Sequence, residues 1–238
     1  MKTNSNSYTI IYSAALVVVV AFLLAFVFQA LKPAQDANVA LDKKKQILSA
    51  LNIRDLSNEA AAAKYKEVVK ADLVLTEKDK ALPTDFSGYD GESKGFKLNS
   101  ADYKAGKLAL FVCDVDGQRK YVVPVYGMGL WGAIWGYIAV DADFQHVYGA
   151  YFNHEGETAG LGAEIKDNRS WQEKFKGKSV FDTKGKVILG VKKKVENSDS
   201  EVDAVTGATL TSNGVDDMLK ECLAKYKSII NNNGGVQQ

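Results

Sequence analysis

The chain has 238 residues, a formal net charge of +1 and 46% hydrophobic residues. This length allows one soluble domain with a core of its own. The charge balance argues against nucleic acid as a partner, because the lysine runs at residues 43–45 and 192–194 are too short to form a basic face.

Residues 8–31 form an almost uninterrupted apolar run without a formal charge. With about 1.5 Å of rise per residue, a helix of this length spans a hydrocarbon layer of about 30 Å. We therefore expect a short tail at residues 1–7 and one transmembrane helix at residues 8–31. A cleaved signal peptide is the alternative, but its apolar core would be about 7–15 residues long, and no convincing small-x-small cleavage site precedes Lys32.

Few charges flank this predicted anchor. Lys2 precedes it, whereas Lys32 and residues 43–45 follow it. The positive-inside rule therefore weakly predicts that the large soluble part lies in the cytoplasm.

Good helix formers at helical spacing continue from Asp36 to about Lys80, so residues 32–80 are expected to be a helical connector packed on the domain. Pro83 and the glycines after it break the pattern. We place the folded domain at residues 81–230. The Asn- and Gly-rich residues 231–238 are expected to be a flexible tail.

Strand-like segments rich in Val, Ile, Tyr and Phe dominate the middle of the chain. They lie at 108–115, 119–126, 133–140, 146–152 and 186–194. Short turns separate the first four, which predicts antiparallel neighbours. A last helix is expected at residues 213–230, with an apolar face formed by Val215, Met218, Leu219, Cys222, Leu223 and Tyr226. The predicted fold class is α+β, a largely antiparallel sheet with flanking helices.

Residues 127–132, Gly-Met-Gly-Leu-Trp-Gly, match the pattern G-x-G-x-x-G after a predicted strand. A dinucleotide site requires a helix that begins at the third glycine and directs its N-terminus at the pyrophosphate. Here residues 133–140 favour a strand. The glycines are therefore interpreted as a turn that permits close backbone approach beside Trp131 and Trp135.

The segment with the strongest functional signal is residues 203–209, Asp-Ala-Val-Thr-Gly-Ala-Thr, which Leu-Thr-Ser follows. One interpretation is structural: a hydroxyl here caps a helix that starts near Asn213. The candidate caps are Thr209, Thr211 and Ser212. The acids at residues 216–217 would already complement the helix dipole, which argues against a simple anion-binding N-terminus.

A single cap does not explain the whole run. A covalent phosphoester requires an exposed hydroxyl on a turn with small neighbours, and Thr206, Gly207, Ala208 and Thr209 supply such a turn. Asp203 lies three residues before Thr206, where a modifying enzyme could recognise the segment or hold a metal.

Residues 154–164, His-Glu-Gly-Glu-Thr-Ala-Gly-Leu-Gly-Ala-Glu, are a second unusual stretch. Glu157 and Thr158 offer an acceptor and a hydroxyl for the polar edge of a flavin ring, while Leu161 would pack on its face. An irregular loop with a helix that starts near Glu164 explains the same pattern. The residues alone leave both interpretations open.

Cys113 lies in a predicted buried strand and Cys222 on the apolar face of the last helix, so both are expected to be buried thiols rather than a disulfide or a ligand pair. The histidines are His146 and His154, and His154 is expected to be a hydrogen-bonded structural histidine. These few ligands predict no protein-only transition-metal site.

Together, these segments resemble the NqrC family, the C subunits of the bacterial sodium-translocating NADH:quinone oxidoreductase. The resemblance covers nearly the whole chain. It includes the anchor and residues 31–42, 129–132, 157–162 and 203–209. The flavin-attachment pattern of this family, D-x-x-[S/T]-G-A-T, is matched at every fixed position. One departure is Ala159, where the family usually has proline, so this loop is expected to be less rigid.

The resemblance implies that Thr209 is esterified to the phosphate of FMN, with one FMN per chain. It implies a separate flavin transferase, with FAD as donor and Mg²⁺, that acts on the extracytoplasmic side. It therefore places the soluble domain in the periplasm, against the weak charge asymmetry, and the anchor in the cell inner membrane. The other membrane subunits of the complex are the implied partners. The motifs and the resemblance assign flavin binding to Asp203, Thr206, Gly207, Ala208, Thr209, Leu210, Thr211, Glu157, Thr158, Gly160, Leu161, Gly162 and Trp131.

The implied function is electron transfer through FMN as NADH reduces ubiquinone or menaquinone, with no catalytic side chain. Thr211 is the acceptor expected if Thr209 is not the attachment residue. The anchor lacks the polar residues of an ion path, so this subunit is not expected to conduct sodium.

Two alternatives remain. The G subunit of the related Rnf-type ferredoxin:NAD oxidoreductase complex shares the anchor, the loop and the attachment motif, but residues 33–42 and 130–131 argue against it. A membrane-tethered binding protein without a cofactor would use the threonines only as caps.

Overall fold

The computed structural model describes residues 6–79, 82–83, 85–227 and 229. It divides into two compact units, Met1–Lys43 and Lys44–Gln238. The tail predicted at residues 231–238 lies outside the described residues, as do residues 1–5.

Helix α1 runs from Asn6 to Ala50 and is long and apolar enough in its first part to cross a membrane. The predicted apolar helix at residues 8–31 is thus confirmed as part of a longer helix, which fits a single-pass anchor. The helix continues through Pro33. Its last turn belongs to the second unit, where Ile47, Leu48 and Ala50 are buried.

The connector is less helical than expected. Helix α2 spans Asn58–Val68 and begins at Ser57, whose hydroxyl accepts a hydrogen bond from the amide of Ala60 at 3.2 Å. The helical pattern predicted to Lys80 ends at Val68, and β1 follows at Val69–Thr76. The sequence Val-Lys-Ala-Asp-Leu-Val-Leu-Thr forms an edge strand because it pairs with β2. This long-range pairing outweighs the local helix propensity on which the prediction was based.

Five antiparallel strands form one sheet in the order β1-β2-β3-β4-β5. After β1, the strands are β2 (Lys107–Val115), β3 (Gln118–Met128), β4 (Ala133–Asp141) and β5 (Val147–His154). Asp116 and Gly117 connect β2 to β3 with φ of +52° and +77°, as a two-residue hairpin turn requires. The four strands predicted between residues 108 and 152, and the α+β class, are confirmed.

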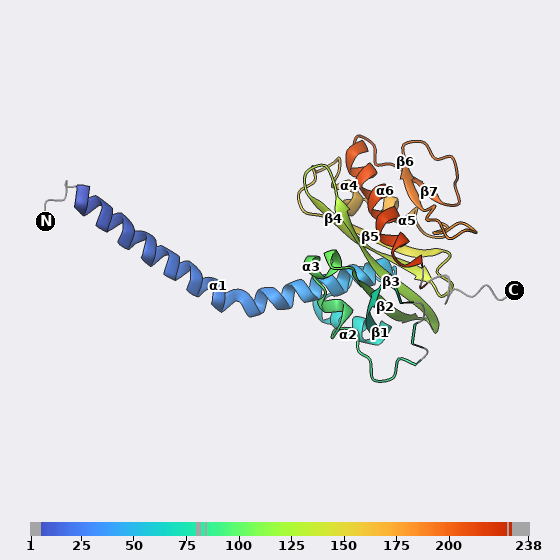
Figure 1. Ribbon diagram of the computed structural model, residues 1–238, viewed down its shortest axis with the longest axis horizontal. Coiled ribbons are helices and arrows are strands. Elements are labelled where there is room, and N and C mark those ends of the chain that lie inside the picture. Colours follow the sequence, from blue (N-terminus) through green and yellow to red (C-terminus); the bar gives the residue numbers. More distant parts are fainter. Residues whose placement is uncertain (1–5, 80–81, 84, 228, 230–238) are drawn as a thin grey trace. The chain divides into compact units, whose positions relative to one another are not determined.

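Helices cover both faces of this sheet (Figure 1). In β2, Leu108, Leu110 and Val112 belong to the larger core. The alternating Ala109 and Phe111 are buried on the opposite face. Helix α6 (Thr209–Ala224) packs along β3, while α4 (Glu164–Asp167) and α5 (Arg169–Glu173) pack against β5. Helix α2 lies against β1 and β2.

Shorter elements complete the unit. They are η1 (Gly95–Lys97), α3 (Ser100–Lys104), β6 (Gly190–Lys192) and β7 (Glu201–Asp203). The strand predicted at residues 186–194 is therefore only three residues long, and β6 pairs with β7 in parallel. The apolar face predicted for the last helix is confirmed, since all six of its side chains are buried.

Candidate functional site

Three segments that are distant in the sequence line one hollow of about 330 Å³, called here the attachment pocket. They are the turn between β3 and β4, the loop after β5 and the turn before α6. Their lining residues are Leu130, Trp131, Glu157, Thr158, Leu161, Gly162, Gly207, Ala208, Thr209, Leu210 and Thr211. Ten of these were among the thirteen predicted site residues. Leu130 was not, although it lies in the glycine-bounded segment that the sequence singled out.

The other three predicted residues lie beside this pocket. Gly160, Asp203 and Thr206 line a neighbouring hollow of about 330 Å³ that also contains Lys174. The Asp203 carboxylate accepts hydrogen bonds from Lys174 Nζ at 2.8 and 2.9 Å, and its carbonyl oxygen accepts one from Trp171 Nε1 at 2.7 Å. Asp203 and Thr206 therefore line the hollow next to the one that contains Thr209.

Helix α6 starts four residues earlier than expected, at Thr209 rather than near Asn213. Ala208 is its N-cap, and no side chain of the described residues caps this end. Consequently the acids at residues 216–217 lie two turns into the helix, and its first turn contains no acid. The prediction that they neutralise the helix dipole at its start is wrong, because the macrodipole acts mainly within the first turn.

The early start also separates the four hydroxyls of this region. Thr206 and Thr209 are exposed, whereas Thr211 and Ser212 are each 1% exposed. Thr211 Oγ1 donates to Glu157 Oε2 at 2.6 Å, and Ser212 Oγ accepts from the amide of Val205 at 3.1 Å. Thr211 and Ser212 are therefore buried and hydrogen-bonded, whereas Thr206 and Thr209 are exposed.

Gly207 forms the turn immediately before the helix. Its φ is +76°, which favours glycine, and a Cβ there would lie 2.9 Å from Leu161 Cδ2. Both the backbone conformation and the neighbouring loop therefore require glycine at the residue that presents Ala208 and Thr209.

The walls of the attachment pocket are apolar and unusually exposed. Leu130 is 47% exposed, Trp131 69%, Leu161 43% and Leu210 59%. Large apolar side chains gathered at the surface of one pocket indicate a binding site for an apolar or aromatic group. This arrangement fits a flavin ring, and the exposed residue Thr209 lines the same pocket.

Glu157 lines the pocket, as predicted, but its carboxylate is largely buried. It is only 7% exposed, and its carboxylate accepts from the backbone amide of Trp131 at 2.9 Å and from the hydroxyl of Thr211. The amide of Glu157 donates to Nδ1 of His154 at 3.1 Å, so His154 has the structural hydrogen bond that was predicted. The helix expected near Glu164 is also present, as α4.

Asp216 fastens α6 to the small parallel sheet. Its carboxylate accepts from the amide of Val191 at 2.9 Å, from Lys192 Nζ at 3.0 Å and from Lys220 Nζ at 2.5 Å. Burial alone would raise the pKa of Asp216, but these hydrogen bonds outweigh burial and hold the pKa below its ordinary value. The helix that begins at Thr209 is thereby fixed against the domain.

The glycines at residues 127–132 precede a strand, β4, as predicted, so they do not form a dinucleotide site. Instead, Gly127 in β3 and Gly214 in α6 allow the helix and the strand to approach each other closely. A Cβ at Gly127 would lie 2.9 Å from Met218 Cβ, and a Cβ at Gly214 would lie 2.2 Å from the carbonyl oxygen of Met128.

Cys113 and Cys222 are free and buried, as predicted, and burial raises the pKa of both thiols. Among the described residues, no cluster of three or more His, Cys, Asp or Glu side chains could hold a metal ion.

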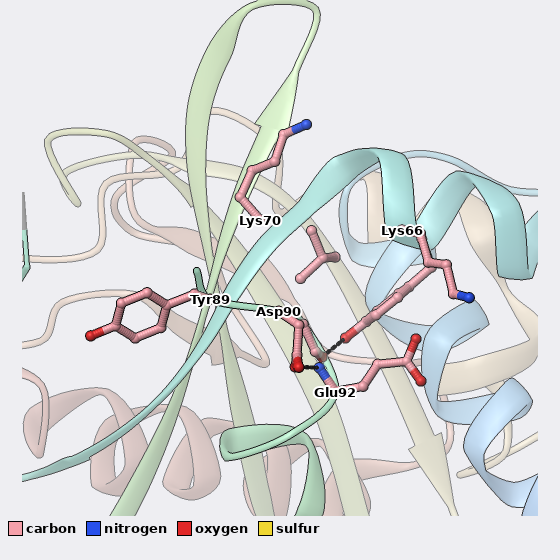
Figure 2. A pocket seen from close by; sticks show the side chains of 8 residues that line it. Lys66, Lys70, Tyr89, Asp90 and Glu92 are labelled. Carbon is pink, nitrogen blue, oxygen red and sulfur yellow. Dashed lines mark hydrogen bonds between the residues drawn. The ribbon is translucent and has the colours of Figure 1, made fainter. Parts of the chain in front are cut away.

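A larger hollow, of about 540 Å³, lies between α2, β1 and residues 89–92. Figure 2 shows Lys70 on the side of this hollow opposite to Asp90 and Glu92. Its lining has mixed charges and includes none of the predicted site residues. Volume alone therefore does not identify the candidate site.

The family model for the FMN-binding domain matches residues 129–224, from the start of the Leu130–Trp131 turn to the end of α6. The C subunit of the Na⁺-translocating NADH-quinone reductase of Neisseria meningitidis serogroup A is 33% identical over 228 residues, covering 89% of this chain and 87% of that protein. The same subunit of Haemophilus ducreyi is 34% identical over 235 residues, covering 91% and 89%.

Two crystal structures are also similar. That of the corresponding C subunit from Parabacteroides distasonis has a TM-score of 0.73 and 36% identity, covering 87% of this chain and 98% of that one. That of Shewanella oneidensis NqrC has a TM-score of 0.63 and 26% identity, covering 82% and 97%.

Proposed function

Because the chain belongs to the family of C subunits of Na⁺-translocating NADH-quinone reductases, we propose that it is a membrane-anchored electron carrier with one FMN joined to Thr209 through a phosphoester. Bound FMN would supply the redox chemistry. The chain's own residues supply the attachment hydroxyl, the walls of the pocket and the local charge.

One observation carries this proposal: Thr209, an exposed hydroxyl residue, lines the pocket that all three motif segments line. A transferase needs an accessible hydroxyl residue, and Thr209 is exposed, whereas Thr211 is buried. A tethered isoalloxazine ring needs apolar walls within reach, and Leu130, Trp131, Leu161 and Leu210 provide them.

The position of Thr209 at the start of a 16-residue helix also suits a phosphate ester. The first amides of a helix have no carbonyl in the preceding turn, so they point toward an anion at this end. With no acid in the first turn of α6, the macrodipole favours a negative group there by about 0.3–1 kcal/mol.

We place α1 in the cell inner membrane and the soluble unit in the periplasm, where a flavin transferase would load it. The partners are the other membrane subunits of the complex. Residues 8–31 contain no ionisable side chain apart from tyrosine, so sodium is proposed to pass through other subunits. Sodium uptake by vesicles that contain this subunit alone would contradict that assignment.

Family membership favours the C subunit over the alternative of the G subunit. The alternative of a cofactor-free binding protein requires the threonines to act as helix caps. The geometry argues against it, because Ala208 is the N-cap and Thr209 remains exposed.

Mass spectrometry tests the attachment. Trypsin releases residues 195–220 as one peptide, which contains Thr206, Thr209, Thr211 and three serines. In protein produced with the transferase, fragmentation should localise one FMN, less one water, on Thr209. Thr209→Val should abolish the adduct, and Thr206→Val should retain it. An adduct that persists in Thr209→Val would move the attachment to another hydroxyl.

A further inference from the structure

Glu157 is a buried carboxylate with neutral partners only. Its two oxygens accept from the Trp131 amide at 2.9 Å and from the Thr211 hydroxyl at 2.6 Å. No lysine, arginine or histidine among the described residues lies within ion-pair distance of it. A carboxylate that is 7% exposed and has no counterion is unusual, because burial of an unpaired charge is costly.

Its two partners belong to different segments that line the attachment pocket. Trp131 lies in the turn between β3 and β4, whereas Thr211 is the third residue of α6, two residues after Thr209. Glu157 itself comes from the loop after β5. One side chain therefore connects all three segments that form the pocket.

Two glycines make room for this carboxylate. A Cβ at Gly129 would lie 2.4 Å from Glu157 Oε1, and a Cβ at Gly162 would lie 2.4 Å from Oε2 and 2.7 Å from Thr211 Oγ1. Neither glycine has a positive φ, so the backbone does not require glycine at these positions. The close approach of the Glu157 carboxylate requires it at both positions, and at Gly129 a Cβ would also lie 2.9 Å from Ile134 Cγ2.

We propose that Glu157 is a positioning residue that latches the Trp131 turn to the first turn of α6, and whose unpaired negative charge lowers the reduction potential of the flavin beside it. The second part rests on the proposed attachment of FMN at Thr209. The latch fixes the distance between the attachment residue and the apolar wall. The charge opposes the addition of electrons to any group in the pocket that Glu157 lines.

The latch is tested in full-length protein made without the transferase, so that no flavin is present. Hydrogen–deuterium exchange should become faster in the peptide that contains Trp131 when Thr211→Val or Glu157→Ala is introduced. Glu157→Gln should preserve protection, because its amide oxygen can accept from Trp131 and its amide nitrogen can donate to Thr211. Unchanged exchange in both Thr211→Val and Glu157→Ala would overturn the latch.

A pair of glycine variants tests the same contact without removing a polar group. Gly162→Ala should speed exchange at Trp131, because the new Cβ displaces the carboxylate. Gly156→Ala is the matched control, since no atom lies within 4 Å of a Cβ there and its φ is not positive. Equal exchange in the two variants would contradict the proposed role of the Glu157 carboxylate in holding the Trp131 turn.

The charge is tested in protein loaded with flavin, by titration with dithionite at fixed pH. Glu157→Gln should shift the midpoint potential in the positive direction, whereas Thr211→Val, which keeps the charge, should shift it much less. A residue with only a structural role would not produce this difference, so equal potentials in wild type and Glu157→Gln would overturn the charge effect. If wild type carries no flavin on Thr209, the proposed function fails together with the charge effect, while the exchange experiment still decides the latch.

Discussion

Asp216 should determine how firmly α6, and with it Thr209, is held on the domain. Asp216→Ala removes the acceptor of the buried Val191 amide and two ammonium partners. The unpaired amide should cost about 1–3 kcal/mol. The lysine side chains are 39% and 40% exposed and can return to water, so their loss should add no more than about 1 kcal/mol.

The sum, about 1–4 kcal/mol, corresponds to a fall of about 2–16 °C in the melting temperature of a unit of this size. Asp216→Asn should cost about 1 kcal/mol, because its amide oxygen can still accept from Val191. The assay is thermal unfolding of the full chain in detergent, followed by near-ultraviolet circular dichroism. Asp217→Ala, an exposed neighbour on the same helix, is the control.

The pH dependence gives a second check. The pKa of Asp216 is lower in the folded protein than its ordinary value of 3.8, so the folded state binds the proton less readily than the unfolded state. This stabilisation is therefore fully present above the unfolded pKa and is lost as the pH falls through the folded pKa. Asp216→Asn should lack this acid-sensitive component. If Asp216→Ala unfolds at the same temperature as Asp217→Ala, the anchoring argument is wrong.

Three further variants test other parts of the account. Gly207→Ala should destabilise the protein by about 1–2 kcal/mol through its positive φ and reduce the flavin occupancy measured by absorbance; unchanged occupancy would show that this turn does not control presentation of the acceptor. Trp131→Ala should change stability by less than about 0.5 kcal/mol, because the side chain is exposed, yet it should increase the quenching of flavin fluorescence by iodide. Equal quenching in the variant and wild type would show that Trp131 does not shield the flavin ring from solvent. Asp72→Ala should cost about 2–4 kcal/mol in urea unfolding, since two loop amides lose their buried acceptor, and Asp72→Asn should cost less.

Local patterns were sufficient for most of the sheet. Residues 108–152 alternate strand-like runs with short turns, and four strands followed where the pattern placed them. The strand at Val69–Thr76 was missed because the helix formers before it continued the helical pattern, and only its pairing with β2 reveals it.

The attachment motif was identifiable as a motif, but its geometry was not. Thr-Leu-Thr-Ser contains β-branched and capping residues, which favour a later helix start, whereas packing against β3 extends α6 back to Thr209. The contact of Glu157 with Thr211 joins residues 54 positions apart, and no local rule predicts it. That contact shows why Thr211, though near in sequence, is not equivalent to Thr209.

The central claim is that Thr209 carries the flavin. The most direct measurement is fragmentation mass spectrometry of residues 195–220 from full-length protein produced with a flavin transferase. Our account predicts one FMN, less one water, on Thr209 and none on this peptide in Thr209→Val. A peptide without a flavin adduct in wild type, or an adduct localised to Thr206 or Thr211, would contradict it.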